Sequence, residues 1–310
     1  MISICIPTYN RINDLKKCLD SIFNGFKNYP YEIIIADGGS TDGTIDYLKN
    51  LDEVKLIEQG KLTGAVKAFN LCFKAAKGDF ILTVTDDFIV NADVIIKTCE
   101  LMKKDKQIGL VGPKLQETKY GKLHNIHLPV KPYWILSPKI FFFKTSVIKE
   151  IGYFDEKFRT YYIDLDFPLM ILNLGYTIAV TRDVGLVHFR IHDEEVNRAK
   201  KINTNKSLEN KEVMYLQKKW EPLQIKIEEY LEKSDIKKQK ALLFKKLFSM
   251  MYYAEWLRPF IITYNKMAMK LFDWLLEQAI IFRDHRYKNH KKLFLAQKLP
   301  SEVISHSKNF

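Results

Sequence analysis

Short β-rich runs alternate with amphipathic helical segments through the first third of the chain, and this alternation narrows the possible folds more than any other feature. Residues 2–6, 31–36, 54–57 and 80–84 have the composition of strands. Apolar residues between positions 12 and 26 recur at spacings of three and four, which predicts a helix with one buried stripe. Residues 65–76 and 94–104 repeat that pattern. The order predicts an α/β fold, a mainly parallel sheet flanked by helices.

In sheets of this kind, ligands bind beyond the carboxyl ends of the strands, where the chain passes from strand to loop. Polar residues follow three of the predicted strands: residues 7–11 (PTYNR), residues 37–43 (DGGSTDG) and residues 85–87 (TDD). All of them offer hydrogen-bonding or anionic groups. The sequence therefore predicts one ligand site at this edge of the sheet.

Asp86 and Asp87 are the strongest chemical signal in the chain. Two adjacent carboxylates after a buried strand are costly to hold together unless a positive charge lies beside them. A divalent cation, Mg²⁺ or Mn²⁺, would meet that need and would clamp a substrate diphosphate. An acidic turn that caps the next helix explains the pair equally well, so the pair alone leaves both interpretations open.

Several motifs, taken together in their order, resemble those of the family 2 glycosyltransferases. They are residues 6–11 (IPTYNR), residues 35–44 (IADGGSTDGT), residues 64–70 with Ala75, and Gly78-Asp79-Phe80 leading into Thr85-Asp86-Asp87. The resemblance covers about residues 2–190. It implies the Rossmann-like GT-A fold, with a nucleotide-sugar-binding and catalytic domain over residues 1–200 and an acceptor side over about 110–200.

The resemblance also implies which residues hold the donor. In similar proteins the loop after the first strand and the aspartate after the second hold the nucleoside. These residues are here Pro7, Thr8, Tyr9, Asn10 and Asp37. A carboxylate can accept from a ribose hydroxyl or a base N–H, although Asp37 alone would also suit an Asx-turn before its two glycines. Lys67 is a further candidate for contact with the diphosphate.

The metal ligands expected from the resemblance are Asp87 and His188. The family's Asp-x-Asp element aligns with residues 85–87, where Thr85 replaces the first aspartate. We assign Asp86 to the sugar nucleotide and Asp87 to Mn²⁺ or Mg²⁺. Related enzymes often bring a histidine from the region of His188 to the metal, whereas a lone histidine is more often structural.

Asp164 is the predicted general base. In similar enzymes an acidic pair after a Phe-Asp-Glu turn places the base beside the acceptor; here Ile163 stands in place of the glutamate and Asp164 keeps the aspartate. The role needs a carboxylate about 3 Å from the attacking hydroxyl. Asp166, two residues before Pro168, is interpreted as the N-cap of a helix near residues 167–174.

The stretch from Leu110 to Pro138 contains glycines and prolines that predict loops, and we interpret it as an acceptor-side insertion. Beyond it, we expect a pair of short strands at residues 177–180 and 185–189. Four cysteines lie far apart in apolar surroundings, which favours buried thiols over disulfides or a metal site. The first residues contain no export signal, so we expect a cytoplasmic protein.

Residues 201–310 form a basic region that differs from the rest. Residues 200–310 contain 23 Lys and Arg against 12 Asp and Glu, nearly all of the net charge of +12. We expect amphipathic helices, with one at residues 266–279, and no membrane-spanning helix, because charges interrupt every apolar run. Two interpretations stay open: a tail lying peripherally on the inner face of an anionic membrane, or a subdomain that packs or dimerises.

The predicted function is transfer of a sugar from a nucleotide-diphosphate sugar to an acceptor hydroxyl, with a UDP-sugar favoured. The acceptor would be a growing cell-envelope or capsular polysaccharide, another glycan or a lipid-linked molecule. The resemblance implies a direct displacement with inversion at the anomeric carbon. The alternatives are a nucleotidyltransferase that forms sugar nucleotides and a basic protein that binds nucleic acid or membrane. The first normally has a glycine-rich loop after strand one, and no nucleic-acid-binding motif accompanies the charge.

Overall fold

The computed structural model describes residues 1–117, 121–123, 126–130, 133–159, 162–189, 206–233, 282–287 and 290–304. The strands are β1 Ile2–Thr8, β2 Tyr31–Asp37, β3 Val54–Glu58, β4 Phe80–Thr83, β5 Phe88–Val90, β6 Ile108–Glu117, β7 Gly121–Leu123, β8 Ile126–Val130, β9 Tyr133–Leu136, β10 Phe142–Lys144, β11 Thr177–His188 and β12 Leu293–Gln297. The helices are α1 Ile12–Gly25, α2 Thr44–Lys49, α3 Ala65–Ala75, α4 Ala92–Lys104, α5 Thr145–Ile151, α6 Ile163–Asn173, α8 Lys206–Lys233 and a 3₁₀ turn, His285–Tyr287.

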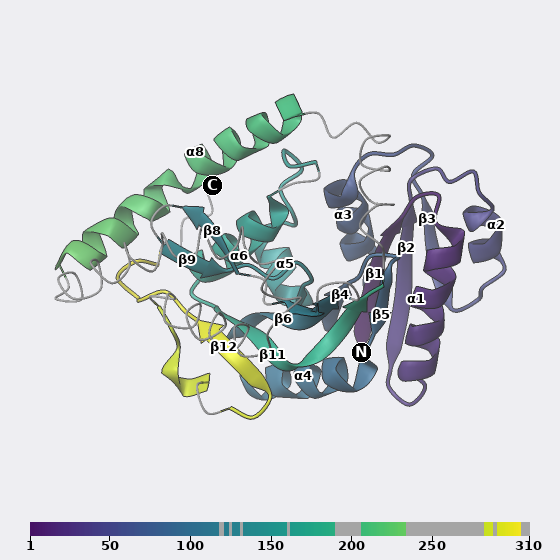
Figure 1. Ribbon diagram of the computed structural model, residues 1–310, viewed down its shortest axis with the longest axis horizontal. Coiled ribbons are helices and arrows are strands. Elements are labelled where there is room, and N and C mark those ends of the chain that lie inside the picture. Colours follow the sequence, from purple (N-terminus) through teal and green to yellow (C-terminus); the bar gives the residue numbers. More distant parts are fainter. Residues whose placement is uncertain are drawn as a thin grey trace.

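A central sheet runs through the molecule in the order β12-β11-β6-β10-β4-β1-β2-β3 (Figure 1). β5 adds to β11, β7 adds to β6, and β8 and β9 form a separate hairpin. β1 pairs in parallel with β2 and β4, and β2 with β3, whereas β10 runs antiparallel between β4 and β6. The prediction of an α/β fold with a central sheet flanked by helices is confirmed; the sheet is parallel from β4 through β1 and β2 to β3, and mixed beyond β4. The four predicted strands lie within two residues of their predicted ends.

The two faces of the sheet bury two separate apolar cores, because successive strand residues point to opposite faces. On β1, Cys5 packs with α3, α5, α6 and α8, whereas Ile4 and Ile6 pack with α1 and α4. The apolar stripe predicted for α1 is the buried one: Leu15, Cys18, Leu19 and Ile22. All four cysteines are free and buried, as the sequence predicts.

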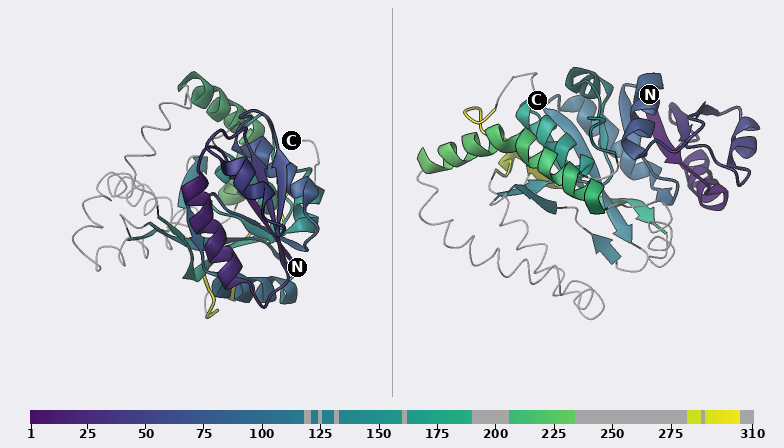
Figure 2. Two further views of the ribbon diagram at one scale, coloured as in Figure 1. Left: turned by 90° about the vertical axis from the view of Figure 1, so that its right-hand side faces the viewer. Right: turned by 90° about the horizontal axis from the view of Figure 1, so that it is seen from above.

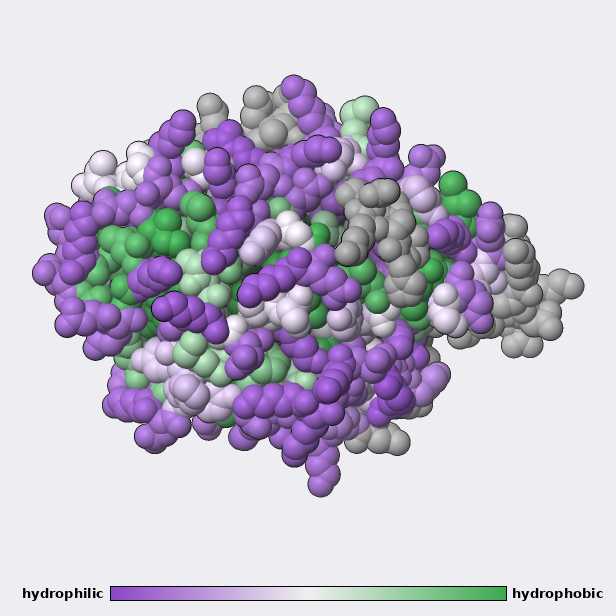
Figure 3. Space-filling view, turned by 180° about the vertical axis from the view of Figure 1, so that it is seen from behind, coloured by the Kyte–Doolittle hydropathy of each residue, from purple (hydrophilic) through white to green (hydrophobic). Residues whose placement is uncertain are grey.

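The surface is mostly hydrophilic on the face opposite the first view, with apolar residues showing between the charged ones (Figure 3). Most of them gather on the side that carries β2 and β3. β3 is the edge strand of the sheet, and its apolar residues Val54, Leu56 and Ile57 remain only partly buried. An edge strand covered on one side only leaves such residues half exposed.

The prediction of loops from Leu110 to Pro138 is wrong over most of the described stretch, because β6, β7, β8 and β9 lie there, and β6 is a central strand of the sheet. Its Pro113 has no N–H to pair, and β11 accommodates it with a bulge in which residues 181–183 oppose this single residue. The Lys114 N–H donates to Thr181 Oγ1 at 2.8 Å. β11 is accordingly one bulged strand, and the predicted pair of short strands is wrong.

The N-cap assignment of Asp166 is also wrong. α6 begins at Ile163, after Tyr162 in the left-handed region (φ 62°), so Asp166 lies inside the helix and is fully buried. Pro168 does not start the helix; it lies in the second turn. Its missing N–H would have bonded the Asp164 carbonyl, and the Ser137 hydroxyl donates to that carbonyl instead.

The basic C-terminal region is helical at α8, as predicted, but the expectation of helix fails at residues 293–297, which form β12 on the antiparallel edge of β11. Seen from above, the green α8 lies along the part of the molecule away from the purple N-terminal strands (Figure 2, right). The predicted helix at residues 266–279 lies outside the described residues. No helix in the described ranges combines the length and apolar character that crossing a bilayer requires.

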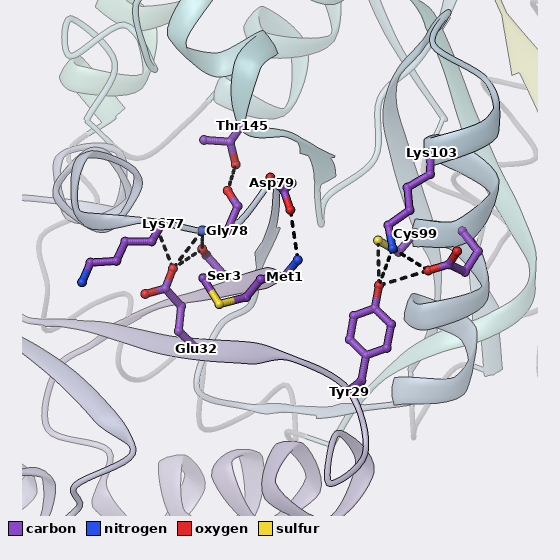
Figure 4. A network of polar contacts seen from close by, with 11 residues as sticks. Met1, Ser3, Tyr29, Glu32, Lys77, Gly78, Asp79, Cys99, Lys103 and Thr145 are labelled. Atoms are coloured by element: carbon purple, nitrogen blue, oxygen red, sulfur yellow. Dashed lines mark hydrogen bonds and ion pairs between the residues drawn. The ribbon is translucent and has the colours of Figure 1, made fainter.

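A polar network joins the strands at the edge of the sheet opposite the predicted ligand site (Figure 4). Glu32 of β2 accepts hydrogen bonds from Ser3 Oγ of β1 (2.5 Å) and from the backbone N–H groups of Lys77 (2.6 Å) and Gly78 (3.0 Å). Thr145 of α5 donates to the Gly78 carbonyl at 2.6 Å. One carboxylate thus connects β1, β2 and the turn before β4, and fixes their relative positions.

Replacing Glu32 with Ala tests that connection. The variant leaves the Lys77 N–H and the Ser3 hydroxyl without their acceptor, while the Gly78 N–H keeps Ser3 Oγ at 2.9 Å, and we expect the unfolding free energy to fall by about 1–3 kcal/mol. Urea unfolding followed by circular dichroism measures the change. Glu58→Ala on β3 is the matched control: its ion pair with Lys49 (2.9 Å) is about half exposed and should be worth at most about 1 kcal/mol. Equal effects of the two substitutions would contradict the assignment.

Candidate active site at the carboxyl ends of the strands

The parallel register gathers the three polar loops at one edge of the sheet. Thr8 lies opposite Asp37, and Cys5 lies opposite Thr83, so the residues after β4 continue beside those after β1. The Gly38 N–H donates to the Thr8 carbonyl, and the Val84 N–H donates to the Cys5 carbonyl. The predicted donor residues and the predicted metal residues therefore belong to one site.

Asp86 and Asp87 lie in the turn between β4 and β5, and both are buried, with side chains only 4% and 5% exposed. Asp86 accepts from Thr8 Oγ1 at 2.8 Å and from Arg11 Nη1 at 2.5 Å. Asp87 accepts from Thr85 Oγ1 and from Arg11 Nη1, each at 2.7 Å. One guanidinium nitrogen therefore bridges the two carboxylates and supplies the positive charge that the pair requires.

The two carboxylates have opposite shifts in their pKa values. Burial raises the pKa of Asp86 to about 7, against the opposing charge of Arg11. Burial also disfavours ionisation of Asp87, but the hydrogen bond with His188 and the charge of Arg11 outweigh it and hold the Asp87 pKa below its ordinary value. Burial works against the charge of Arg11 too, yet the two carboxylates raise its pKa. Asp87 is therefore the carboxylate that stays anionic near neutral pH.

His188 reaches this site from the far end of β11. β5 and β11 pair so that His188 lies opposite Phe88, and the two rings stack with centroids 4.7 Å apart. The His188 Nε2 atom lies 3.4 Å from Asp87 Oδ2, and the Phe189 N–H donates to the Asp87 carbonyl. The structure thus places both predicted metal ligands side by side; their role as ligands stays a prediction.

Asn10 and Asp37 connect the loops after β1 and β2. Asn10, in the left-handed region (φ 51°), receives the Thr41 N–H on its side-chain oxygen at 2.7 Å and donates its own N–H to Ser40 Oγ at 2.8 Å. Asp37 accepts from the N–H groups of Gly39 and Ser40 and from Ser40 Oγ, at 2.6–2.8 Å. This is the Asx-type turn that its glycines suggest. A carboxylate has about four acceptor positions, so one remains for a ligand.

Tyr9 forms one side of a narrow space over Gly38. A Cβ on Gly38 would lie 3.4 Å from the Tyr9 ring and 3.0 Å from Leu62, so the absent side chain lets both approach. Pro7 is half-buried at the end of β1, and Lys67 is exposed in the first turn of α3. The tyrosine and the buried carboxylate of Asp37 border the same loop.

Asp164 lies in the first turn of α6, half-buried, with its carbonyl bonded to Ser137. Four residues after Ser137, the Phe141 N–H donates to Thr83 Oγ1 at 2.8 Å, and Thr83 lies three residues before Asp86. Four residues span at most roughly 14 Å. The segment 137–141 is therefore bonded to α6 at one end and to β4 at the other.

The site contains donors that suit Mn²⁺ or Mg²⁺, but few of them. No group of three or more His, Cys, Asp or Glu side chains arranged for a metal occurs within the described ranges. Asp87 and His188 would supply one oxygen and one nitrogen, and Mg²⁺-type sites commonly take their other ligands from substrate phosphates and water. The Arg11 Nε–H is buried without a partner, so a donor for an anionic oxygen lies beside the pair. The residues fit a cation that arrives with a diphosphate.

Arg11 is the candidate site residue that the sequence interpretation missed, although it belongs to the motif of residues 6–11. It follows the Pro-Thr-Tyr-Asn loop as the N-cap residue of α1, and that loop leaves β1, the strand adjacent to β4. The argument that two buried carboxylates need a positive charge could have selected it, because it is the one basic residue among the three polar loops. Thr85, which replaces an aspartate of the family pattern, was also given no role; it donates to Asp87.

A family model described as glycosyl transferase family 2 matches residues 3–161, more than half of the chain. Among curated proteins, a Methanococcus voltae dolichyl N-acetyl-α-D-glucosaminyl phosphate 3-β-D-2,3-diacetamido-2,3-dideoxy-β-D-glucuronosyltransferase is 30% identical over 57% of this chain and 63% of its own length. A Pyrococcus furiosus dolichol-phosphate mannosyltransferase is 32% identical over 40% of this chain and 35% of its own length. The chain thus spans less than two thirds of these relatives.

Solved structures share the fold at low sequence identity. The mannosyltransferase PcManGT from Pyrobaculum calidifontis, in complex with GDP-Man and Mn²⁺, aligns with a TM-score of 0.51 at 19% identity, over 64% of this chain and 60% of its own. S. aureus TarS in complex with UDP-GlcNAc aligns with a TM-score of 0.50 at 21% identity, over 62% of this chain and 59% of its own. At this level the comparison establishes the architecture of the chain.

Replacing Arg11 with Ala tests its role as counter-charge. The variant leaves two buried carboxylates unpaired, and we expect unfolding free energy to fall by about 3 kcal/mol or more in the presence of a chelator. Added Mn²⁺ should restore part of the loss, and differential scanning fluorimetry measures both effects. In the control Arg286→Ala, the lost partner of Asp284 is 53% exposed, so a change below about 1 kcal/mol is expected. An Arg11 variant as stable as the parent would remove the basis for this role.

Proposed function

The chain is a member of glycosyl transferase family 2, and from that premise we propose that it transfers a sugar from a nucleotide-diphosphate donor to an acceptor hydroxyl. One observation carries the proposal. Two buried carboxylates, an arginine and a histidine converge where the polar loops after β1 and β2 end. That arrangement suits a diphosphate and its cation, and the family match favours a glycosyltransferase over the nucleotidyltransferase and nucleic-acid-binding alternatives.

The nucleoside end of the donor is assigned to the loops after β1 and β2. Tyr9 offers a ring face for the base above Gly38, and the remaining acceptor position of Asp37 suits a base N–H or a ribose hydroxyl. Thr8 donates to the Asp86 carboxylate, and the Asn10 side-chain oxygen accepts the backbone N–H of Thr41 in the loop after β2. In this proposal Pro7 shapes the loop, and Lys67 contacts the diphosphate from α3.

Asp87 and His188 would hold Mn²⁺ or Mg²⁺, and Asp86 would face the sugar nucleotide. The bound cation supplies neutralisation of the charge that grows on the diphosphate as the glycosidic bond breaks. The Arg11 Nε–H, which has no partner, would donate to a phosphate oxygen. The positive charge of Arg11 would also help to neutralise the negative charge that develops on the diphosphate. Thr85 keeps the Asp87 carboxylate oriented.

Asp164 is the proposed general base. The acceptor hydroxyl oxygen attacks the anomeric carbon, its proton passes to the Asp164 carboxylate, and the bond to the diphosphate oxygen breaks with its electron pair. A single displacement of this kind inverts the anomeric configuration. The hydrogen bond from Ser137 to the Asp164 carbonyl holds the first turn of α6, on which the carboxylate depends for its direction.

The class of substrate is proposed from the relatives. TarS was solved with UDP-GlcNAc and PcManGT with GDP-Man, and we favour a UDP-sugar for this chain. Relatives named for dolichyl or dolichol phosphate, together with a Pasteurella multocida chondroitin synthase, support a glycan or lipid-linked acceptor. A cytoplasmic location, peripheral at the inner face of the membrane, agrees with the basic region 201–310.

A screen of UDP-, GDP-, CMP- and dTDP-sugars tests the donor assignment. One of them, with Mn²⁺ or Mg²⁺, should stabilise the protein against thermal unfolding, by about 2.7 kcal/mol at one hundred times its dissociation constant. Asp87→Asn should lose the metal-dependent part of that stabilisation together with sugar transfer. Asp183→Asn, an exposed aspartate on β11, serves as control. Absence of stabilisation by any sugar nucleotide, with either metal, would defeat the proposed function.

Asp164→Asn tests the base. The amide keeps the shape of the side chain but cannot accept the proton, so the transfer rate should fall by a factor of about 10²–10⁴ while donor affinity stays within about twofold. Turnover is measured by release of the nucleoside diphosphate in the presence of acceptor, and donor affinity by calorimetry. A variant that transfers sugar at the parent rate would assign the base to another residue.

A further inference from the structure

The long helix α8 is part of the core next to the acceptor side of the molecule. Its inward residues Leu216, Trp220, Leu223 and Ile227 follow at spacings of four, three and four, and all are at most 4% exposed. They belong to the same apolar cluster as Phe154, Phe158 and Phe167. In Figure 1, α8 runs along the side of the molecule that carries α6 and the β8-β9 hairpin. The apolar stripe of this helix is thus used within the chain.

A charged network links α8 to α6 within this apolar core. Lys219, 3% exposed, places its Nζ 2.9 Å from Asp155 Oδ2 and 2.9 Å from Asp166 Oδ1. The Trp220 indole N–H donates to Asp166 Oδ1 at 2.8 Å, and the Tyr215 hydroxyl donates to Asp155 Oδ2 at 2.7 Å. Buried ion clusters of this kind often stabilise a protein no better than apolar residues of the same volume. We therefore look for the role of this network in positioning α6 rather than in stabilising the fold.

Both carboxylates lie in the part of the chain that carries the proposed base. Asp166 is two residues after Asp164 on α6, and Asp155 lies in the turn after α5. A third contact strengthens the link, since Glu212 of α8 accepts the Arg159 N–H at 2.7 Å. The Arg159 carbonyl in turn packs against Gly64 at the start of α3, where a Cβ would come within 2.6 Å. α8 therefore holds segments on either side of the base.

The first turn of α6 needs such support because its local sequence disfavours it. Tyr162, immediately before the helix, has a positive φ of 62°, which costs energy in a residue with a bulky side chain. Pro168 cannot donate to the Asp164 carbonyl. No side chain caps the helix start. The direction of Asp164 thus depends on contacts from outside the helix: the Ser137 hydroxyl on one side, and Lys219 and Trp220 on the other.

We propose that α8 positions the general base: Lys219 and Trp220 hold Asp166 and thereby keep the first turn of α6, with Asp164, directed at the acceptor. The inference rests on the proposed function and deepens it. Lys219 and Trp220 are positioning residues, because they act through Asp166. The C-terminal region is, on this view, a component of the acceptor site.

Trp220→Phe and Tyr215→Phe form a matched pair that tests the proposal. Each removes one hydrogen bond from α8, but only the first removes one from Asp166. For Trp220→Phe we expect kcat for transfer to fall by about tenfold or more, because small misplacements of a catalytic group are costly, while the donor KM and donor affinity stay unchanged. The Tyr215→Phe variant should stay within about twofold. Asp166→Asn, which keeps an oxygen for the indole, should retain more kcat than Asp166→Ala.

Hydrogen exchange gives a readout that does not depend on turnover. The amides of residues 163–167 should exchange faster in Trp220→Phe than in Tyr215→Phe, with the amides of α3 unchanged in both. Equal losses of kcat in the pair, or unchanged exchange at α6 in Trp220→Phe, would overturn the proposal. If the parent protein transfers no sugar, the proposed function fails, and the exchange measurement alone then decides whether α8 holds the first turn of α6.

Discussion

The need to neutralise two neighbouring buried carboxylates governs the site and much of the fold around it. Asp86 and Asp87 lie behind β4, nearly closed to solvent. An uncompensated charge in such a place costs several kcal/mol, comparable with the 5–15 kcal/mol by which a whole domain is stable. Arg11 supplies the charge from the neighbouring strand's loop. In the proposed function, the same residues would receive a cation and a diphosphate.

The strand order decides which loops share that place. β1 lies between β2 and β4, so the loops that follow these three strands meet at one edge. The end of β11 pairs antiparallel with β5, and this pairing places His188 beside Asp87. At the opposite ends of these strands, Glu32 accepts hydrogen bonds from the turn before β4. The proposed site and this stabilising network therefore lie at opposite ends of the parallel strands.

The described elements of the C-terminal third pack on the rest of the chain. β12 extends the sheet beyond β11, and α8 covers the face that also carries α3, α5 and α6. β12 pairs with a strand more than a hundred residues earlier in the chain, and α8 contacts residues 53 to 64 positions before it. A basic, helical sequence by itself suggests an appended segment, but its buried residues Lys219 and Trp220 contact the helix that carries Asp164.

The sequence alone determined the elements whose signal is local. The first four strands, the helices that alternate with them, the buried cysteines and the loops that would meet at the ligand edge all follow from periodicity and composition. The motifs after the strands pointed to the family and to Asp87, His188 and Asp164 as a set. These features are encoded over a few residues, by which face of a helix or strand is apolar and by which residues turn the chain.

Only the tertiary structure decided how distant residues pair. β6 forms a strand despite Gly112 and Pro113 because β11 bulges to accommodate the proline. Asp166 resembles a helix cap in the sequence, but its partners are Lys219 and Trp220, more than fifty positions away. Arg11 became the counter-charge of Asp86 and Asp87 because β1 and β4 are neighbours. In each case the partner lies far along the chain, so the interaction between the two residues forms only when the fold brings them together.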